Sequence, residues 1–238
     1  MRISEMNWMD VEARVAEDDR CILPIGSTEQ HAQLSLSVDS ILAERVSVEA
    51  AEPLKVPVFP VMPFGLAPYF AGYPGTITLR VETLTAVIRD VIASLDRSGF
   101  RRILIVNGHG GNQPAGAVAN ELMIDSPHLS IKFHNWWSAP KTWAKVQSVD
   151  PSGSHANWME NYPWTRLAHA PAPCPATPKP APDMVATKAA EPVLARELLG
   201  DGAFGGDYQK DDAVMLDIWN TGVAEVRDAL EGPWPTRS

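Results

Sequence analysis

The sequence predicts an α/β fold in which a mostly parallel β-sheet is covered by helices on both faces. The first observation is a set of short runs rich in β-branched residues, at 20–26, 103–106 and 129–137, which are typical of buried strands. The second is the helical segments between them. The clearest spans 81–98, where apolar residues recur at spacings of three and four. A chain of 238 residues fits one such domain.

The other elements follow in chain order. Helices are expected over 4–17, 39–51, 81–98, 115–123, 191–199 and 212–230. A further strand is expected over 56–62, where Pro57 and Pro60 indicate a sheet edge or an irregular path. Residues 168–182 are nearly all alanine and proline, which predicts an extended, polyproline-like arm. Residues 1–238 are therefore expected to form a single domain that carries this arm.

Composition argues against several classes of partner. The formal charge of −9 disfavours a nucleic-acid backbone or an anionic membrane as partner. No apolar run reaches the roughly 20 residues that a membrane-spanning helix needs. The first residues carry early acids and no long apolar stretch, so we expect no signal peptide. The two cysteines, Cys21 and Cys174, offer no disulfide framework, which favours a cytoplasmic location.

The strand at 103–106 ends in a polar turn rich in glycine, Asn107-Gly108-His109-Gly110-Gly111-Asn112. Glycines let the backbone approach a ligand closely, and Pro114 is suited to the first turn of the helix that follows. In open α/β sheets, ligands bind beyond the carboxyl ends of the strands. His109 is therefore a candidate functional residue, although a histidine that only hydrogen-bonds the turn fits the same sequence.

A carboxylate and an imidazole follow the first strand. Glu29 and His31 are two residues apart, so their side chains point to the same side of an extended segment. Asp39 opens the next helix, which suits a helix N-cap as well as a metal ligand. With His109 and Glu160 they make two imidazoles and three carboxylates, the ligand set of a two-metal hydrolytic site. Oxygen and nitrogen ligands suit Zn²⁺, Mn²⁺ or Fe²⁺.

Aromatic residues offer candidate pocket walls. The loop 63–76 carries Tyr69 and Phe70 beyond the end of a predicted strand. Packing of these aromatics among themselves would explain them equally well. Of the two tryptophans that end the strand 129–137, Trp137 is the candidate for a pocket and Trp136 is expected in the core.

Taken together, these motifs resemble the creatininase family of metal-dependent amidohydrolases. The matching stretches, in order, are 26–31 with Asp39, the end of the aromatic loop at 73–79, the turn 106–112, and His155-Ala156 with Glu160 five residues later. The resemblance implies a Rossmann-like three-layer α/β/α fold and two divalent ions per subunit. It also implies hydrolysis of a non-peptide C–N bond in a small cyclic or linear amide, and a homohexamer.

The resemblance further implies a role for each site residue. The ion ligands would be Glu29 and His109 for one ion, His31 and Glu160 for the other, and Asp39 shared between them. His155 would carry a proton to the leaving nitrogen, with Glu160 close by in the catalytic site. The residues expected to contact substrate are Tyr69, Phe70, Gly110, Gly111 and Trp137.

The sequence departs from the family in several places. The family usually has a second histidine three residues after the first, and it is absent from the segment after His31. Phe70 stands where the family often has a histidine, and Asn157 replaces a glycine. Creatininases have their last glutamate at the position of Gly111. These changes make creatinine itself a poor candidate substrate.

Two other interpretations stay open. A family relative could deformylate a formamidopyrimidine nucleotide or trim a modified peptide. Phosphate binding would then need arginines, and the candidates are Arg80, Arg101 and Arg102, of which the last two precede their strand and so lie at its wrong end. The chain could also be a non-catalytic metal-binding homologue, although the presence of His155 argues against this.

Overall fold

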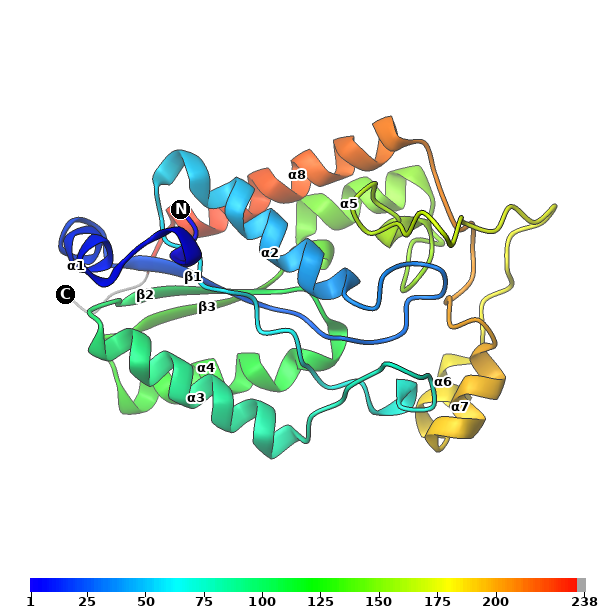
Figure 1. Cartoon of the computed structure of the whole chain (residues 1–238), viewed down its shortest axis with the longest axis horizontal. Coiled ribbons are helices and arrows are strands. Elements are labelled where there is room, and N and C mark those ends of the chain that lie inside the picture. The colour runs from blue at the N-terminus through cyan, green and yellow to red at the C-terminus, as the bar shows by residue number, and fades with distance from the viewer. Residues whose placement is uncertain (235–238) are drawn as a thin grey trace.

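Three parallel strands form the centre of the molecule. The computed structural model describes residues 1–234. The strands lie side by side in the order β1 (Arg20–Ile25), β2 (Arg102–Asn107) and β3 (Ser130–Asn135) (Figure 1). Ile25 pairs with Asn107, and Asn107 pairs with Asn135, so all three strands end at the same edge of the sheet. The expected parallel α/β sheet is confirmed.

Helices cover both faces of this sheet (Figure 1). The first face carries α2 (Val38–Ala51), α5 (Pro140–Val149) and α8 (Asp212–Glu231), and the second carries α3 (Val81–Arg97) and α4 (Gln113–Asp125). Successive side chains of β2 enter different cores. Leu104 shares one hydrophobic core with Trp219 of α8, whereas Ile103 shares the other with Ile88 of α3. The result is the expected three-layer α/β/α arrangement.

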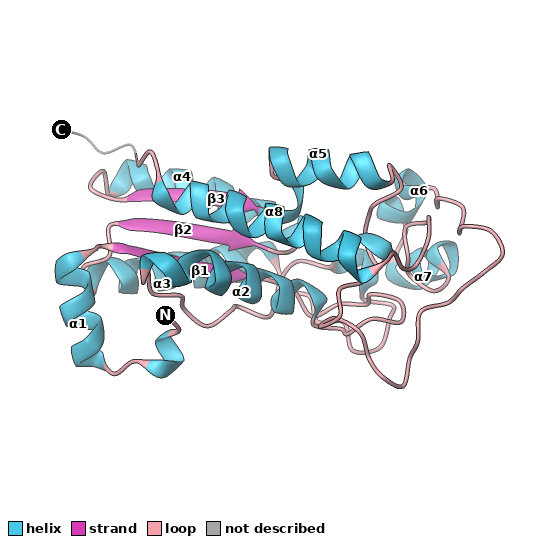
Figure 2. Cartoon of the chain, turned by 90° about the horizontal axis from the view of Figure 1, so that it is seen from above, coloured by secondary structure: helices cyan, strands magenta, loops and turns pink. Residues whose placement is uncertain are grey.

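A pair of short helices lies beyond the carboxyl ends of the strands (Figure 2). They are α6 (Met184–Ala189) and α7 (Pro192–Leu199), started by Asp183 and Glu191, whose carboxylates each accept two backbone N–H groups. Helix α7 is held against the aromatic loop, because the Tyr73 hydroxyl donates to the Gly200 carbonyl at 3.0 Å. The pair therefore forms one side of the region where the strands end.

The structure differs from the sequence-based prediction in three segments. Residues 56–62 make isolated bridges to β1 through Val58 and Met62 instead of a regular strand, because their prolines cannot donate to a ladder. Helices α5 and α6 were not expected.

Two further segments flank the main layers. Helix α1 (Trp8–Glu17) begins at Asn7, whose side chain accepts the Asp10 N–H in a reciprocal cap. Residues 168–182 contain no helix or regular strand, as expected for the arm, and Lys179 fastens its end by backbone pairing with Gly206. Within residues 1–234, no helix combines the length and the apolar character needed to cross a membrane.

Candidate metal centre

Four of the predicted ligand residues meet at the carboxyl edge of the sheet. Glu29 and His31 lie on the loop after β1, His109 lies in the turn after β2, and Asp39 lies in the first turn of α2. One oxygen of Asp39 is 3.2 Å from His31 Nε2, and the other is 3.0 Å from His109 Nδ1. His109 Nδ1 is also 3.2 Å from Glu29 Oε1. Asp39 therefore stands between the two imidazoles.

Glu160 reaches the same place from a different part of the chain. Its Oε2 is 3.5 Å from His31 Nε2. The loop before it folds back because the Ala156 N–H donates to Glu160 Oε2 at 2.6 Å and Asn157 caps the 3-10 turn. Ala156 has φ of +58°, a left-handed conformation that a non-glycine residue adopts only in a tight turn. Glu160 is thus placed by a local turn and not by helical spacing from His155.

The ligand-type atoms form three overlapping groups. Within each group the atoms lie no more than 4.8 Å apart. The groups are Glu29–Asp39–His109, His31–Asp39–Glu160 and Glu29–His31–His155. We call the first two the ligand triads. Because they share Asp39, they can bring two cations close together with one carboxylate between them.

Both imidazoles of the triads are fixed by a hydrogen bond at their other nitrogen. His109 Nε2 is 2.8 Å from the Leu66 carbonyl, and His31 Nδ1 is 3.1 Å from the Glu29 carbonyl. A carbonyl can only accept, so each ring carries its proton on that side in the neutral state. The opposite nitrogens, His109 Nδ1 and His31 Nε2, then present lone pairs to the carboxylates, as metal-binding histidines do.

The buried charges of this cluster shift one another's pKa values. Burial raises the pKa of Glu160 to about 7, with Asp39 adding to the rise against the opposing effect of His31. Burial alone would lower the pKa of His31, but Asp39 and Glu160 raise it to about 10. The same carboxylate-imidazole attraction raises the pKa of His109 well above its usual value, again against burial. Each histidine of the triads therefore binds a proton more readily than a free imidazole does.

The donor set fits divalent cations. Glu29 Oε1, Asp39 Oδ2 and His31 Nε2 are buried and have no hydrogen-bond partner. Such atoms cost free energy unless something satisfies them. They belong to the two triads, and their oxygen and nitrogen chemistry suits Zn²⁺, Mn²⁺ or Fe²⁺.

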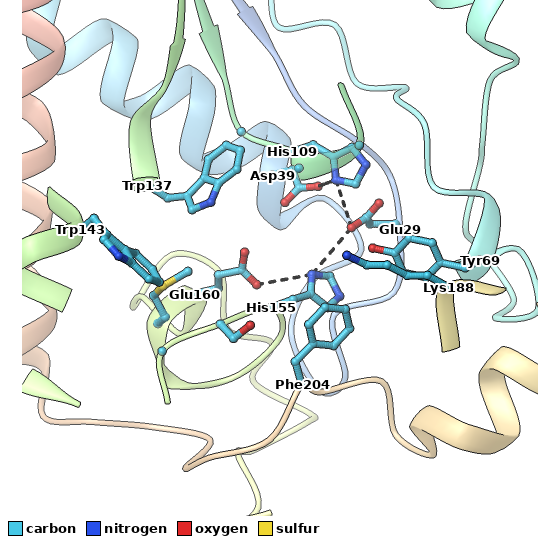
Figure 3. A pocket seen from close by; sticks show the side chains of 16 residues that line it. Glu29, Asp39, Tyr69, His109, Trp137, Trp143, His155, Glu160, Lys188 and Phe204 are labelled. Atoms are coloured by element: carbon cyan, nitrogen blue, oxygen red, sulfur yellow. Dashed lines mark ion pairs between the residues drawn. The ribbon is translucent and has the colours of Figure 1, made fainter. Parts of the chain in front are cut away.

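His155 lies at the edge of the cluster, next to Phe204 (Figure 3). Phe70 stacks on it with the ring centroids 4.6 Å apart, and Phe204 approaches to 4.8 Å. Its Nδ1 is 3.8 Å from carboxylate oxygens of both Glu29 and Glu160. Burial, with the nearby charge of His31, lowers the pKa of His155 well below its usual value. His155 is therefore a neutral imidazole with one nitrogen turned toward the ligand triads.

A cavity of about 450 Å³ opens onto the triads. Of the residues expected to contact substrate, Tyr69, Gly110, Gly111 and Trp137 line it. Phe70 does not line it, because this ring is buried behind His155. The lining residues that were not anticipated include Trp143, Lys188 and Phe204. They lie on or beside helices α5, α6 and α7, and none of them directly follows a strand, so the strand-end rule could not find them.

With this geometry established, comparison with known proteins identifies the family. The creatininase model, described as creatinine amidohydrolase, matches residues 4–229. The chain belongs to the creatininase family. The match includes every residue of the ligand triads.

Three relatives illustrate the range of this family. Creatinine amidohydrolase of Pseudomonas putida is 30% identical over 165 residues, which cover 63% of each chain. A 3-dehydro-scyllo-inosose hydrolase of Thermotoga maritima is 31% identical over 107 residues, covering 44% of this chain and 34% of that protein. Mycofactocin precursor peptide peptidase of Mycolicibacterium smegmatis is 34% identical over 112 residues, covering 43% of this chain and 44% of the peptidase. Each match spans less than two thirds of the relative.

Solved structures of the creatininase family share the whole fold. A crystal structure of creatinine amidohydrolase matches 99% of this chain and 98% of its own, with a TM-score of 0.77 and 23% identity. A creatininase variant of Zn-Zn type matches with a TM-score of 0.76 and 24% identity, covering 98% of both chains. The Mn form of creatininase matches with a TM-score of 0.72 and 23% identity, also over 98% of both chains. The Rossmann-like creatininase architecture expected from the sequence is confirmed.

Proposed function

We propose that this chain is a metal-dependent amidohydrolase. It binds two divalent ions, Zn²⁺, Mn²⁺ or Fe²⁺, and cleaves a non-peptide C–N bond of a small cyclic or linear amide. The observation that carries the proposal is the pair of ligand triads sharing Asp39 at the base of a cavity. Membership of a family that includes a creatinine amidohydrolase supports the same reaction class.

Each triad residue has a defined part in this proposal. Glu29 and His109 hold one ion, His31 and Glu160 hold the other, and Asp39 bridges them. When bound, the ions would polarise the amide carbonyl and lower the pKa of an attacking water toward neutrality. The metal types named for the Zn-Zn and Mn creatininases support this choice of cations.

His155 is assigned the proton transfer. Its Nδ1 is turned toward the triads, 3.8 Å from Glu29 Oε1 and from Glu160 Oε2, where a scissile nitrogen would leave. A neutral imidazole can take up a proton at this nitrogen and pass it to the departing amine. Phe70 stacks on the imidazole, Phe204 contacts it at a tilt, and Gln30 contacts Nε2 at 2.8 Å.

The cavity walls favour a small amide over a nucleotide. Within residues 1–234 its lining contains no arginine, and Arg80, Arg101 and Arg102 all lie elsewhere. The phosphate of a formamidopyrimidine nucleotide would therefore find only one basic side chain in this lining, Lys188. Peptide trimming remains the second candidate, favoured by the 34% identity to the mycofactocin precursor peptidase.

A metal-reconstitution assay tests the proposal. The purified chain would be stripped with a chelator, reloaded with Mn²⁺ or Zn²⁺, and offered lactams, ureas, N-formyl compounds and short peptides. We expect turnover of a small amide only in the loaded protein, with two ions bound per chain and creatinine among the poor substrates. Full activity in a rigorously metal-free sample would refute it. Tight metal binding without turnover of any compound would favour the non-catalytic interpretation.

A further inference from the structure

One basic side chain lines the cavity without a hydrogen-bond or ion-pair acceptor in the part of the chain that the structure describes. Lys188 on α6 lines it together with the ligand triads, and no other lysine or arginine is among the lining residues described. Lys188 is an exposed side chain. Some other lysines are ion-paired, such as Lys141 with Asp228 and Lys145 with Asp217. Lys179 donates to the carbonyls of Leu199 and Ala203. Within residues 1–234, Lys188 has no such acceptor.

The position of Lys188 is built by the packing of its helix. Its neighbour Thr187 is fully buried, so α6 packs this side against the rest of the molecule. The next helix, α7, is tied to the aromatic loop, because Arg196 donates to the Gly72 carbonyl at 3.1 Å. This loop carries Tyr69. The two helices therefore bring Lys188 and Tyr69 to the same cavity.

Tyr69 adds a second donor to the lining of the cavity. Figure 3 shows Tyr69 and Lys188 on one side of the view and Trp137 and Trp143 on the other. Burial and the neighbouring carboxylates raise the pKa of Tyr69, so its hydroxyl stays protonated and able to donate. The hydroxyl has no hydrogen-bond partner within residues 1–234. The cavity thus has an aromatic side, a cluster of ligand atoms, and a side with an ammonium and a phenol.

We propose that Lys188 and Tyr69 bind a carboxylate of the substrate, so that the enzyme acts on amides that carry a carboxylate away from the scissile bond. This inference rests on the proposed amidohydrolase function of the same site. An ammonium and a hydroxyl are two donors for one carboxylate, and charge-assisted hydrogen bonds of this kind are the strong ones. A lone lysine suits a singly charged group better than a phosphate, which is usually met by several donors.

Charge complementarity supports a negatively charged ligand. Among the residues described, Lys188 is the one lysine or arginine of the cavity lining, and it lies outside the ligand triads. A substrate carboxylate would pair with it and would turn the amide toward the triads by fixing the opposite end of the molecule.

Matched pairs of amides test the inference. Dihydroorotate and dihydrouracil share a cyclic amide ring and differ in one carboxylate, as do pyroglutamate and 2-pyrrolidinone. Calorimetry with the metal-loaded full chain measures the dissociation constants, and KM is measured wherever a compound turns over. We expect tighter binding of the carboxylate member of at least one pair by about tenfold or more.

Variants then assign the preference to Lys188. Lys188→Gln should remove most of it while leaving the affinity for the neutral member unchanged, and Lys188→Arg should keep most of it. Tyr69→Phe should reduce the preference by a smaller factor. Lys141→Gln removes a lysine that lies outside the cavity and should behave as the unmodified chain.

Two results would overturn the inference. One is equal binding of both members in every pair by the unmodified protein. The other is a carboxylate preference that survives in Lys188→Gln, which would place the carboxylate on the ions. Failure of the proposed function would give a different result. Neither neutral nor charged amides would then be turned over, and no activity would depend on metal, whatever residue stands at position 188.

Discussion

Asp39 is the residue on which the metal centre most depends, because it belongs to both ligand triads. Its carboxylate is 97% buried as a side chain and contacts both His31 and His109. Burial works against its ionisation, yet the two imidazoles keep its pKa below the usual value. The sequence suggested Asp39 as the N-cap of this helix, but Ser37 holds that position and Asp39 lies in the first turn of α2. Its role as a shared metal ligand stays a prediction.

The first prediction concerns Glu160. The change Glu160→Gln keeps the shape of the side chain but removes its charge, which weakens binding of a divalent ion. We expect bound metal to fall from two ions per chain toward one and turnover to fall by about a hundredfold or more. Elemental analysis of the purified variant measures the first effect. The matched control is Glu82→Gln, at a side chain that is 74% exposed. Two tightly held ions with near-normal turnover would show that Glu160 is not a ligand.

The second prediction is that metal binding releases protons. The carboxylates around His31 raise its pKa to about 10 in the metal-free protein, and the pKa of His109 is also raised. The His31 ring therefore carries a proton at pH 8, and the His109 ring binds one more readily than a free imidazole does, whereas a metal ligand must be neutral. Loading should release at least about one proton per chain, and the apparent metal affinity should rise as the pH rises toward 10.

Calorimetry in buffers of different ionisation enthalpy counts these protons. The variant His31→Gln should release about one fewer, because one of the two titrating ligands is gone. Proton release that is absent, or unchanged in this variant, would contradict the assignment.

Individual residues were predictable where a strand end placed them. Glu29, His31 and His109 follow buried strands, and the rule that ligands gather at carboxyl ends of strands found them. Lys188 and Trp143 were missed because they reach the cavity from α6 and α5, two helices that were not predicted from the local sequence. Phe70 was placed in the right loop, but its ring turned inward to stack on His155.

At the scale of elements, the turn between β2 and α4 combines packing with function. Built on the backbone at Gly111, a Cβ atom would collide with the Leu66 carbonyl. That carbonyl is the acceptor which orients the His109 ring. A side chain at position 111 would therefore disturb the His109 ring, which the proposed function assigns as a metal ligand.

A pair of glycine variants supplies the third prediction. Gly111→Ala should cost about 1–3 kcal/mol of unfolding free energy through overpacking and lower metal occupancy, because Leu66 and His109 must both shift. Gly110→Ala is the control, since a Cβ there meets nothing within 4 Å. Thermal unfolding and elemental analysis measure both variants. Equal behaviour of the two would contradict the close packing described for the turn.

A helix that the sequence did not predict is stabilised by residues far away along the chain. Helix α5 starts with the N–H groups of Lys141 and Thr142 donating to Glu225 of α8, at 2.9 and 2.8 Å. This cap comes from more than 80 residues away and leaves no local signal. By contrast, α3 was predicted from its own apolar spacing, which buries Leu84, Ile88 and Ile92.

At the scale of the whole molecule, the helices beyond the strand ends expose apolar side chains. Val185 is 83% exposed, Val193 is 61% exposed and Leu198 is 45% exposed, all on α6 and α7. The extended arm over 168–182 lies nearby in the chain and could cross a neighbouring subunit at little cost in ordering. These features and the family resemblance support a closed homo-oligomer.

The fourth prediction is therefore an assembly of several subunits, with a hexamer expected. Light scattering at micromolar concentration should report a mass about six times the 25.9 kDa of one chain. Replacing Val193 by Glu should lower that mass, because a charge would be buried at the contact. A single chain mass for the unmodified protein would contradict this prediction.

The proline-rich segment over 56–62 also has a consequence for how the protein behaves in concentrated solution. It runs along the outer side of β1 and takes up its free groups, with Ile22 donating to the Pro57 carbonyl and Gly26 to the Met62 carbonyl. An exposed strand edge is a template on which other chains can add and aggregate. Here residues 56–62 occupy that edge, and their prolines lack the N–H group that a further strand would need for hydrogen bonding. Subunits then associate through other surfaces, and the addition of further strands in a fibre is disfavoured at this edge of the sheet.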